Sequence, residues 1–266
     1  MSERLLPERL SFLNPHIVDD LARYGNPRDG GYVLPQSTLS NIDAVLSFGL
    51  STDWSLEEEL AAGHPERLIH VYDHTVGART FRRSLKGAFW KFVGAKTSLA
   101  DLRTRYATDV GYRRFFTGHR VHFRERVFNR QDHTSDATLA IAFARLGAAR
   151  HVLVKIDIEG GEYRIIPELT RFADRIDVIA IEFHDTDPLR PVFEAQIRAL
   201  LDDFAIIHVH GNNIAGIAAD GLPDALEITF LSRRFGIPER RRDRLPVAGL
   251  DRPNDPLRPD VALRFR

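Results

Sequence analysis

The chain of 266 residues contains no cysteine, which excludes disulfide bonds, thiolate zinc sites and cysteine nucleophiles. It also has no net charge, because 37 basic side chains balance 37 acidic ones, and this balance argues against a strongly basic nucleic-acid binder. No apolar run approaches the roughly 20 residues of a membrane-spanning helix, and residues 1–4 do not begin a signal peptide. We therefore expect a cytoplasmic protein with no membrane span and no nucleic-acid partner.

What the chain does contain is a series of short apolar runs separated by longer, helix-like stretches. Several runs are rich in Val and Ile, as in strands that are buried on both faces of a sheet. The runs are residues 44–48, 68–72, 120–128, 151–158, 178–183, 205–209 and 226–231. Helices are predicted between them, for example over residues 55–63, where a Ser cap and an acidic first turn precede a terminal Gly. This alternation predicts a doubly wound α/β domain.

Two stretches depart from the alternation. Residues 75–114 are too long for a bare loop, so we expect an inserted helical lid or a pair of helices there. Residues 211–225 are rich in Gly, Asn and Pro and predict a turn between antiparallel strands, which makes the sheet mostly parallel with an antiparallel last strand. We divide the chain into an N-terminal extension (1–40), the α/β domain (41–235) and an Arg/Pro-rich C-terminal tail (236–266), expected to be solvated.

Charged residues gather at the end of the fourth run. Strand alternation places Lys155, Asp157 and Glu159 on one face, and a lysine inside a core strand needs a partner such as Asp157. Glu162 follows in the first turn of the next helix, where an anion is favourable. A buried ion pair at a strand–helix corner would explain part of this pattern, but three carboxylates around a Gly pair favour a functional site.

The next two runs also end in polar side chains. Glu182 and His184 share one face, and a histidine beside a carboxylate has the raised pKa and fixed tautomer that a general base needs. His208 and His210 share one face of the sixth run and could chelate a divalent metal together with carboxylates. The alternative for this second pair, that the imidazoles line a polar pocket or bind the turn, stays open.

The ends of the first two runs indicate the kind of ligand. Only Gly49 follows the first run, so the G-x-G-x-x-G cradle for a pyrophosphate is missing, which favours a ligand without phosphates. Asp73 ends the second run, at the offset where an acidic residue commonly accepts hydrogen bonds from ribose hydroxyls. Asp73 could equally be a turn residue at a strand end.

Four segments together resemble the FkbM-type methyltransferase-like family of S-adenosylmethionine-dependent enzymes, which often O-methylate sugars. They are D-G-G-Y-V at 29–33, S-F-G-L-S-T-D at 47–53, L-V-K-I-D-I-E-G-G-E-Y at 153–163 and I-E-F-H at 181–184. Residues 208–213 and 251–256 also look like the C-terminal portion of that family. The resemblance implies an enzyme with a Rossmann-like methyltransferase fold, whose seven-stranded sheet has an antiparallel last strand. It also implies an acceptor that is a small molecule or a glycan.

On this resemblance, site residues follow as hypotheses. S-adenosylmethionine is expected to be held by Gly49, Ser51, Asp53, Asp73 and Glu125. The residues expected to be catalytic are Asp157, Glu182 and His184, with His184 taking the proton from a sugar hydroxyl. The residues expected to line the acceptor pocket are Asp29, Gly30, Gly31, Tyr32, Asn212 and Asn213. The 75–114 insert is expected to close over this pocket.

Three alternatives remain open at this point. Mg²⁺, held by Asp157 with Asp185 or Glu182, could bind a sugar diol, since carboxylates suit that ion. A protein with this fold could instead have lost catalysis and serve as a binding module, because its glycine turn is reduced. The third alternative is a metal-dependent hydrolase that uses His208, His210, Asp157 and Glu159. The sequence does not indicate an oligomeric state.

Overall fold

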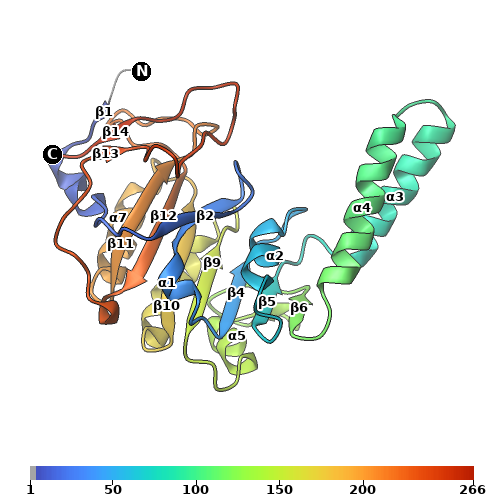
Figure 1. Cartoon of the computed structure of the whole chain (residues 1–266), viewed down its shortest axis with the longest axis horizontal. Coiled ribbons are helices and arrows are strands. Elements are labelled where there is room, and N and C mark those ends of the chain that lie inside the picture. The colour runs from blue at the N-terminus through green and yellow to red at the C-terminus, as the bar shows by residue number, and fades with distance from the viewer. Residues whose placement is uncertain (1–3) are drawn as a thin grey trace.

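The computed structural model describes residues 4–266. The seven predicted strands lie in one sheet (Figure 1). In spatial order the strands are β6 (Arg120–Phe123), β5 (Leu68–Tyr72), β4 (Ala44–Phe48), β9 (Val152–Ile156), β10 (Ile176–Phe183), β12 (Leu226–Ser232) and β11 (Phe204–Gly211). Neighbours from β6 to β10 are parallel, whereas β12 pairs antiparallel with both β10 and β11. The predicted doubly wound, mostly parallel sheet with an antiparallel last strand is confirmed.

The sheet is buried on both faces because its strands are apolar at successive positions. Leu46 and Val154 contribute to one core, which α5 (Leu139–Arg145), α6 (Ile166–Leu169) and α7 (Arg190–Leu200) help to form. Val45 and Leu153, one position earlier in each strand, contribute to the core on the other face, together with α1 (Gln36–Leu39) and α2 (Ser55–Ala61). Burying each such side chain is worth about 1.5–3 kcal/mol, so the alternation stabilises both layers.

The start of α2 differs in detail from the prediction. Ser55 is the first helical residue and not the cap, because Trp54 occupies the cap position, without a capping hydrogen bond from its own side chain. The carboxylate of Asp53 takes that role, since its Oδ1 accepts a hydrogen bond from the backbone N–H of Ser55 at 2.9 Å. An acidic group at this end of a helix is stabilised by the helix dipole. The chain thereby holds the loop after β4 against the helix that follows it.

The insert between β5 and β6 forms two antiparallel helices, α3 (Ala78–Val93) and α4 (Leu99–Phe115). They project from the body of the molecule as a hairpin (Figure 1). At its base, the Trp54 ring lies 6.0 Å from the rings of Phe81 and Tyr112, both in edge-on contact. At its far end, Ser98 caps α4 by accepting a hydrogen bond from the backbone of Asp101.

The two terminal regions pack together on the sheet. Strands β2 (Leu21–Gly25) and β3 (Gly31–Pro35) form a hairpin, and β1 (Arg4–Leu5) pairs with β14 (Leu263–Arg264), which also pairs with β13 (Arg244–Leu245). The remaining short elements are η1 (Glu8–Leu13), β7 (Arg126–Val127), β8 (Asp136–Ala137), η2 (Glu162–Arg164), η3 (Thr170–Phe172) and η4 (Arg233–Phe235). Within residues 4–266, no helix combines the length and apolar content needed to cross a membrane.

The expectation that the C-terminal stretch is a solvated tail is wrong. Leu263 and Phe265 are buried in the same core as the central strands. Two of its acids also pair with the buried strand β11, because Asp251 lies 2.9 Å from His208 and Asp260 lies 3.0 Å from His210. Its arginines dominate the composition, but these few apolar and acidic side chains hold the stretch in place.

Candidate active site

A cavity of about 870 Å³ opens where the parallel strands end. It is lined by the residues that follow four neighbouring strands: Gly49 after β4, Asp73 after β5, Asp157 after β9 and His184 after β10. The carboxyl ends of parallel strands meet at one edge of a sheet, and α/β proteins bind their ligands in the crevice there. The volume lies in the range of about 300–1,000 Å³ that is usual for small-molecule sites.

Most of the predicted site residues line this cavity. They are Asp29, Gly30, Gly49, Ser51, Asp53, Asp73, Glu125, Asp157, Glu182, His184 and Asn212. Three residues predicted for the acceptor pocket, Gly31, Tyr32 and Asn213, do not line it. The cavity therefore joins the proposed cofactor residues and the proposed catalytic residues in one place.

Each of these three residues has a contact that explains its position. A Cβ at Gly31 would lie 1.9 Å from the carbonyl oxygen of Asn26, so glycine lets the β2–β3 turn close. Tyr32 is buried behind the cavity wall, and its hydroxyl donates to Asp157 Oδ2 at 3.4 Å. Asn213 Nδ2 donates to the carbonyl oxygen of Asp255 at 2.9 Å, which ties down the C-terminal stretch.

His184 is oriented by Glu162, one of the three carboxylates that the sequence analysis grouped around the Gly pair without giving it a catalytic role. Its Nδ1 lies 2.9 Å from Oε1 of Glu162, a side chain with no exposed surface, while Nε2 lies 3.5 Å from the exposed carboxylate of Glu159. The same Oε1 of Glu162 accepts hydrogen bonds from the backbone N–H groups of Ile158 and Gly160. Glu162 thus fixes the ring with its Nδ1 directed inward. The sequence signal that could have assigned this role to Glu162 is its position at the end of the segment K-I-D-I-E-G-G-E, residues 155–162.

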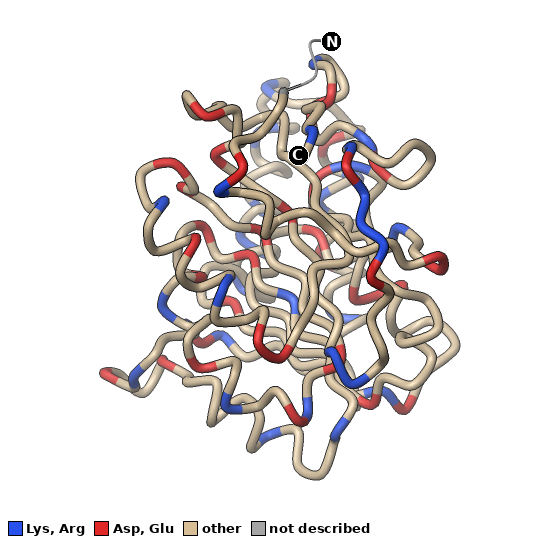
Figure 2. Tube along the Cα trace, turned by 90° about the vertical axis from the view of Figure 1, so that its left-hand side faces the viewer, with Lys and Arg blue, Asp and Glu red and all other residues tan. Residues whose placement is uncertain are grey.

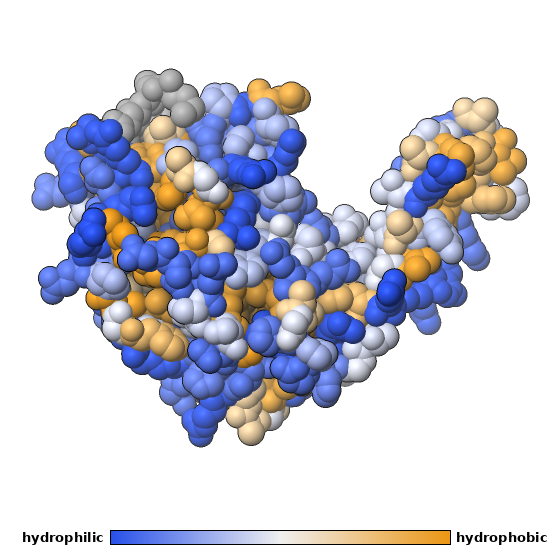
Figure 3. Space-filling model, in the orientation of Figure 1, coloured by the Kyte–Doolittle hydropathy of each residue, from blue (hydrophilic) through white to orange (hydrophobic). Residues whose placement is uncertain are grey.

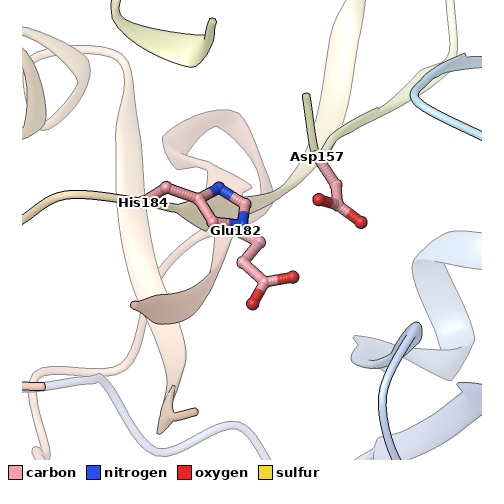
Figure 4. A group of neighbouring side chains, drawn as sticks. All are labelled: Asp157, Glu182 and His184. Carbon is pink, nitrogen blue, oxygen red and sulfur yellow. The ribbon is translucent and has the colours of Figure 1, made fainter. Parts of the chain in front are cut away.

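His184 also lies close to two further acidic side chains of the cavity wall. Ligand atoms of Asp157, Glu182 and His184 all lie within 4.8 Å of one another, and Figure 4 shows the three side chains as neighbours. Glu182 Oε1 accepts a hydrogen bond from Asn212 Nδ2 at 2.8 Å. The predicted pair of Lys155 with Asp157 is present, because Lys155 Nζ lies 3.3 Å from Asp157 Oδ2 and also donates to the Gly49 carbonyl oxygen at 2.8 Å.

The environment shifts the pKa of two of these groups in the same direction. Burial, together with the charges of Asp157 and Glu227, raises the pKa of Glu182 to about 8. Burial lowers the pKa of His184, but the hydrogen bond and charge of Glu162 outweigh it and raise that pKa to about 9. Near neutral pH, Glu182 is thus mainly a neutral acid and His184 mainly an imidazolium.

These shifts make folding stability depend on pH. The folded chain holds both protons more tightly than the unfolded chain, so stability falls as pH rises. The Glu182 contribution falls between the ordinary value of 4.5 and about 8, and the His184 contribution, complete below 6.5, is lost as pH rises through about 9. We expect urea denaturation in EDTA to give a lower unfolding free energy at about pH 9.5 than at about pH 7. The Glu182→Gln variant should show a shallower dependence, and an unchanged slope would contradict the assignment.

Asp73 fixes the loop after β4. Its Oδ2 accepts from the backbone N–H groups of Leu50 and Ser51 at 2.9 and 3.0 Å, and its Oδ1 accepts from the backbone and hydroxyl of Thr75 at 2.7 and 2.6 Å. Burial raises the pKa of Asp73, but these hydrogen bonds outweigh it and lower the pKa below the usual value. All four acceptor positions of the carboxylate are thus in use. The turn role, left open by the sequence, is the one that these contacts show. A hydrogen bond from a ribose, which would have to share or replace one of these donors, stays a prediction.

Two further residues of the cavity wall, Glu125 and Phe128, contact arginines. Glu125 forms a two-point ion pair with Arg145, at 2.6 and 3.0 Å. Phe128, which the sequence analysis did not single out, also lines the cavity, and the guanidinium groups of Arg126 and Arg164 lie over its ring, at 4.7 and 4.9 Å from the centroid. This side of the cavity therefore combines an ion pair with an aromatic ring that two guanidinium groups already contact.

The histidine pair of β11 is not part of the site. His208 and His210 are buried, and neither lines the cavity. His210 places Nδ1 at 3.1 Å from Glu227 and Nε2 at 3.0 Å from Asp260, so both of its nitrogens are engaged. Across residues 4–266, the grouping that could hold a metal ion is Asp157, Glu182 and His184, without either of these histidines. The residues of the hydrolase hypothesis do not form one metal site.

Two other expectations are corrected by the geometry. Asp185, considered as a metal ligand beside Asp157, does not line the cavity, whereas Glu182 does. The α3–α4 hairpin does not close over the acceptor pocket either, since none of residues 78–115 lines the cavity. Only Thr75 and Val76, at the start of the insert, reach its wall.

The comparisons with known proteins give a distant structural likeness. No family model matches the chain, and no curated protein matches it. The chain is similar to one in a fibrillarin/Nop5p complex, with 11% identity, TM-score 0.34, and 87% of this chain and 100% of that chain covered. It is also similar to precorrin-6y C5,15-methyltransferase from Geobacter metallireducens GS-15, with 11% identity and a TM-score of 0.33. This match covers 74% of this chain and 85% of that chain. A third similar structure is that of the O-methyltransferase NcsB1 from neocarzinostatin biosynthesis, in complex with S-adenosylmethionine. The identity is 10% and the TM-score 0.31, and the match covers 73% of this chain and 50% of that chain.

Proposed function

We propose that this protein is an S-adenosylmethionine-dependent O-methyltransferase that acts on a hydroxyl group of a sugar or glycan-like acceptor. The observation that carries the proposal is the oriented histidine: Glu162 holds His184 at 2.9 Å beside Asp157 and Glu182, at the cavity edge of the sheet. A hydroxyl acceptor needs such a base, because its oxygen is a weak nucleophile while it keeps its proton. The sequence resemblance described above points to the same chemistry.

The residues present fit the cofactor. Its binding site would comprise Gly49, Ser51, Asp53, Asp73 and Glu125, which all line the one cavity. A Cβ on Gly49 would lie 1.7 Å from the carbonyl oxygen of Asp157, so glycine is what allows the loop to approach the β9 exit. The wall lacks a glycine-rich pyrophosphate cradle, as suits a nucleoside without phosphates. When bound, the cofactor would supply a methyl group on a positively charged sulfonium, and the carboxylate-rich wall favours that charge.

The chain's own residues would then handle the acceptor. Asp29, Gly30 and Asn212 form part of the wall next to the catalytic group and would orient the sugar. His184 would take the hydroxyl proton, and the buried Glu162 would stabilise the imidazolium that results. Positioning of this kind supplies several kcal/mol, and general-base catalysis adds about 10²–10⁴-fold. Because the pKa of His184 is raised to about 9, turnover should increase with pH up to that value.

A second version of the function keeps the fold and adds a divalent cation. Its specific support is the group of Asp157, Glu182 and His184, whose ligand atoms lie within 4.8 Å of one another. One oxygen of Asp157 is already near Lys155 Nζ, and one oxygen of Glu182 accepts from Asn212. The cation would therefore compete with a lysine and with a bound proton, and we favour the metal-free version.

Calorimetry and turnover together test these versions and the inactive binding module. We expect S-adenosylmethionine and S-adenosylhomocysteine each to bind with measurable heat, and methyl transfer to sugar acceptors to continue after thorough chelation with EDTA. Loss of turnover in EDTA that Mg²⁺ restores would support the cation version. An absence of heat with both nucleosides would reject the methyltransferase and favour a protein that has lost its cofactor site.

A further inference from the structure

The far half of the α3–α4 hairpin exposes a concentration of large apolar side chains. Trp90 and Val93 at the end of α3 are 70% and 62% exposed. The other exposed members are Phe89, Phe92, Leu99 and, near the middle of α4, Tyr106. Figure 3 shows apolar residues gathered at the end of the hairpin that lies farthest from the body. A concentration of exposed apolar side chains of this kind marks an interaction surface.

The charged side chains of the hairpin are also mostly of one sign. Residues 78–115 contain ten basic side chains and two acidic ones, which leaves 27 basic and 35 acidic side chains in the rest of the chain. Both acids are paired within the hairpin, Asp101 with Arg105 and Asp109 with Arg113. On the opposite side of the molecule, by contrast, Lys and Arg are interspersed with Asp and Glu (Figure 2). The chain as a whole is neutral, but residues 78–115 carry a net charge of +8.

We propose that this hairpin docks on the surface of an anionic lipid bilayer. Its exposed aromatic and aliphatic residues would enter the headgroup region, and its lysines and arginines would contact the lipid phosphates. Amphipathic helices that lie on membranes combine these features: Trp, Phe and Leu on one face and Lys or Arg beside them. Lys86 and Arg103 show the arrangement, since they line an apolar groove of about 730 Å³ together with Phe89, Trp90 and Tyr106.

The same charges argue against other occupants. A second copy that docked hairpin to hairpin would bring another +8 hairpin against the first, and the like charges would repel. A single-stranded nucleic acid would match the charge and could stack on Trp90, but Val93 and Leu99 at the far end would gain nothing from phosphates or bases. A lipid surface satisfies both the apolar and the basic side chains.

The hairpin projects from the body of the molecule, so its far end is accessible to a flat surface. Its base is anchored by the aromatic contacts of Trp54 with Phe81 and Tyr112, while its far end extends away from the sheet (Figure 1). Docking requires neither cofactor nor methyl transfer, so the proposal can fail or succeed independently of the proposed function.

Vesicle binding by the full chain tests the proposal. We expect cosedimentation with phosphatidylcholine vesicles that contain roughly one third phosphatidylglycerol, and at least about tenfold weaker binding to pure phosphatidylcholine. Raising the salt from about 0.1 M to about 1 M should weaken binding strongly, because the Debye length falls from about 10 Å to about 3 Å. The Lys91→Gln and Lys96→Gln variants should each bind about fivefold more weakly. The Trp90→Ser/Val93→Ser double variant should lose at least about tenfold.

Tryptophan fluorescence supplies a second readout. The chain has two tryptophans, and Trp54 is buried whereas Trp90 is exposed, so a blue shift on adding vesicles would report Trp90. The shift should disappear in Trp90→Phe, which keeps an aromatic ring. Leu257→Ser is the matched control, because Leu257 is 91% exposed but lies outside the hairpin, and it should bind like the wild type.

Four outcomes would overturn the proposal. They are no binding to anionic vesicles, equal binding by the Trp90→Ser/Val93→Ser variant, tighter binding to polyuridylate than to vesicles, and a dimer in solution that this variant abolishes. The variants alter exposed side chains, and unchanged thermal melting would establish that each of them is folded.

Discussion

Replacing His184 with glutamine is expected to lower the turnover of methyl transfer about 10²–10⁴-fold, the range that a general base contributes. Glutamine keeps a polar side chain but cannot take a proton from the acceptor hydroxyl. Affinity for S-adenosylhomocysteine should stay within about threefold of the wild type, because the proposed cofactor residues do not include His184. Steady-state kinetics and calorimetry on the same preparation measure the two quantities. Wild-type turnover in His184→Gln would show that another group is the base.

A neighbouring carboxylate gives the matched control. Glu159 lies 3.5 Å from Nε2 of His184, but its side chain is 87% exposed, whereas Glu162 is fully buried against Nδ1. Glu159→Gln should leave turnover nearly unchanged, since solvent screens an exposed pair. Glu162→Gln should lower the pKa of His184 from about 9, because it removes the charge that stabilises the imidazolium. The limb of the rate profile that rises with pH should therefore move to lower pH, and an unmoved rising limb would remove Glu162 from the mechanism.

Replacing Gly49 with alanine is expected to abolish cofactor binding and to destabilise the fold by at least about 3 kcal/mol. Gly49 has φ of 90°, where an L side chain is strained, and its Cβ would lie 1.7 Å from the carbonyl oxygen of Asp157. That oxygen belongs to the backbone just after β9 and cannot rotate away. The exits of β4 and β9 would have to separate, and these exits form the cavity wall. Urea denaturation and calorimetry measure the two losses.

Gly63→Ala separates the clash from the backbone strain. Gly63 has φ of 77°, but nothing lies within 4 Å of the Cβ position. Its replacement should therefore cost only about 1–2 kcal/mol, the strain of a left-handed conformation, and should leave cofactor affinity unchanged. If the two variants lost the same stability, the close approach of Gly49 to Asp157 would carry no cost, and the interpretation of this turn would be wrong.

Six of the seven strands were predictable because each is a short, mostly apolar run that is buried on both faces, whereas the edge strand β6 is only partly buried. The positions of Asp73, Asp157 and His184 were predictable for a related reason. Each lies at or just beyond the end of a strand, and parallel strands bring such ends to one edge of the sheet. The partner of His184 was not predictable in this way, since Glu162 begins η2 after the loop that follows β9, whereas His184 follows another strand, β10.

The sequence by itself determined the fold class, the edge of the sheet that carries the site, and most of the residues that line the cavity. Tertiary structure decided which of several candidate groups act together. His208 and His210 have the spacing of a metal pair, but acids from the C-terminal stretch engage both of them inside the core. The α3–α4 insert has the length of a lid but stands away from the cavity. The physical reason is that spacing along a strand or helix is set by local geometry, whereas pairing between distant segments depends on how the whole chain packs.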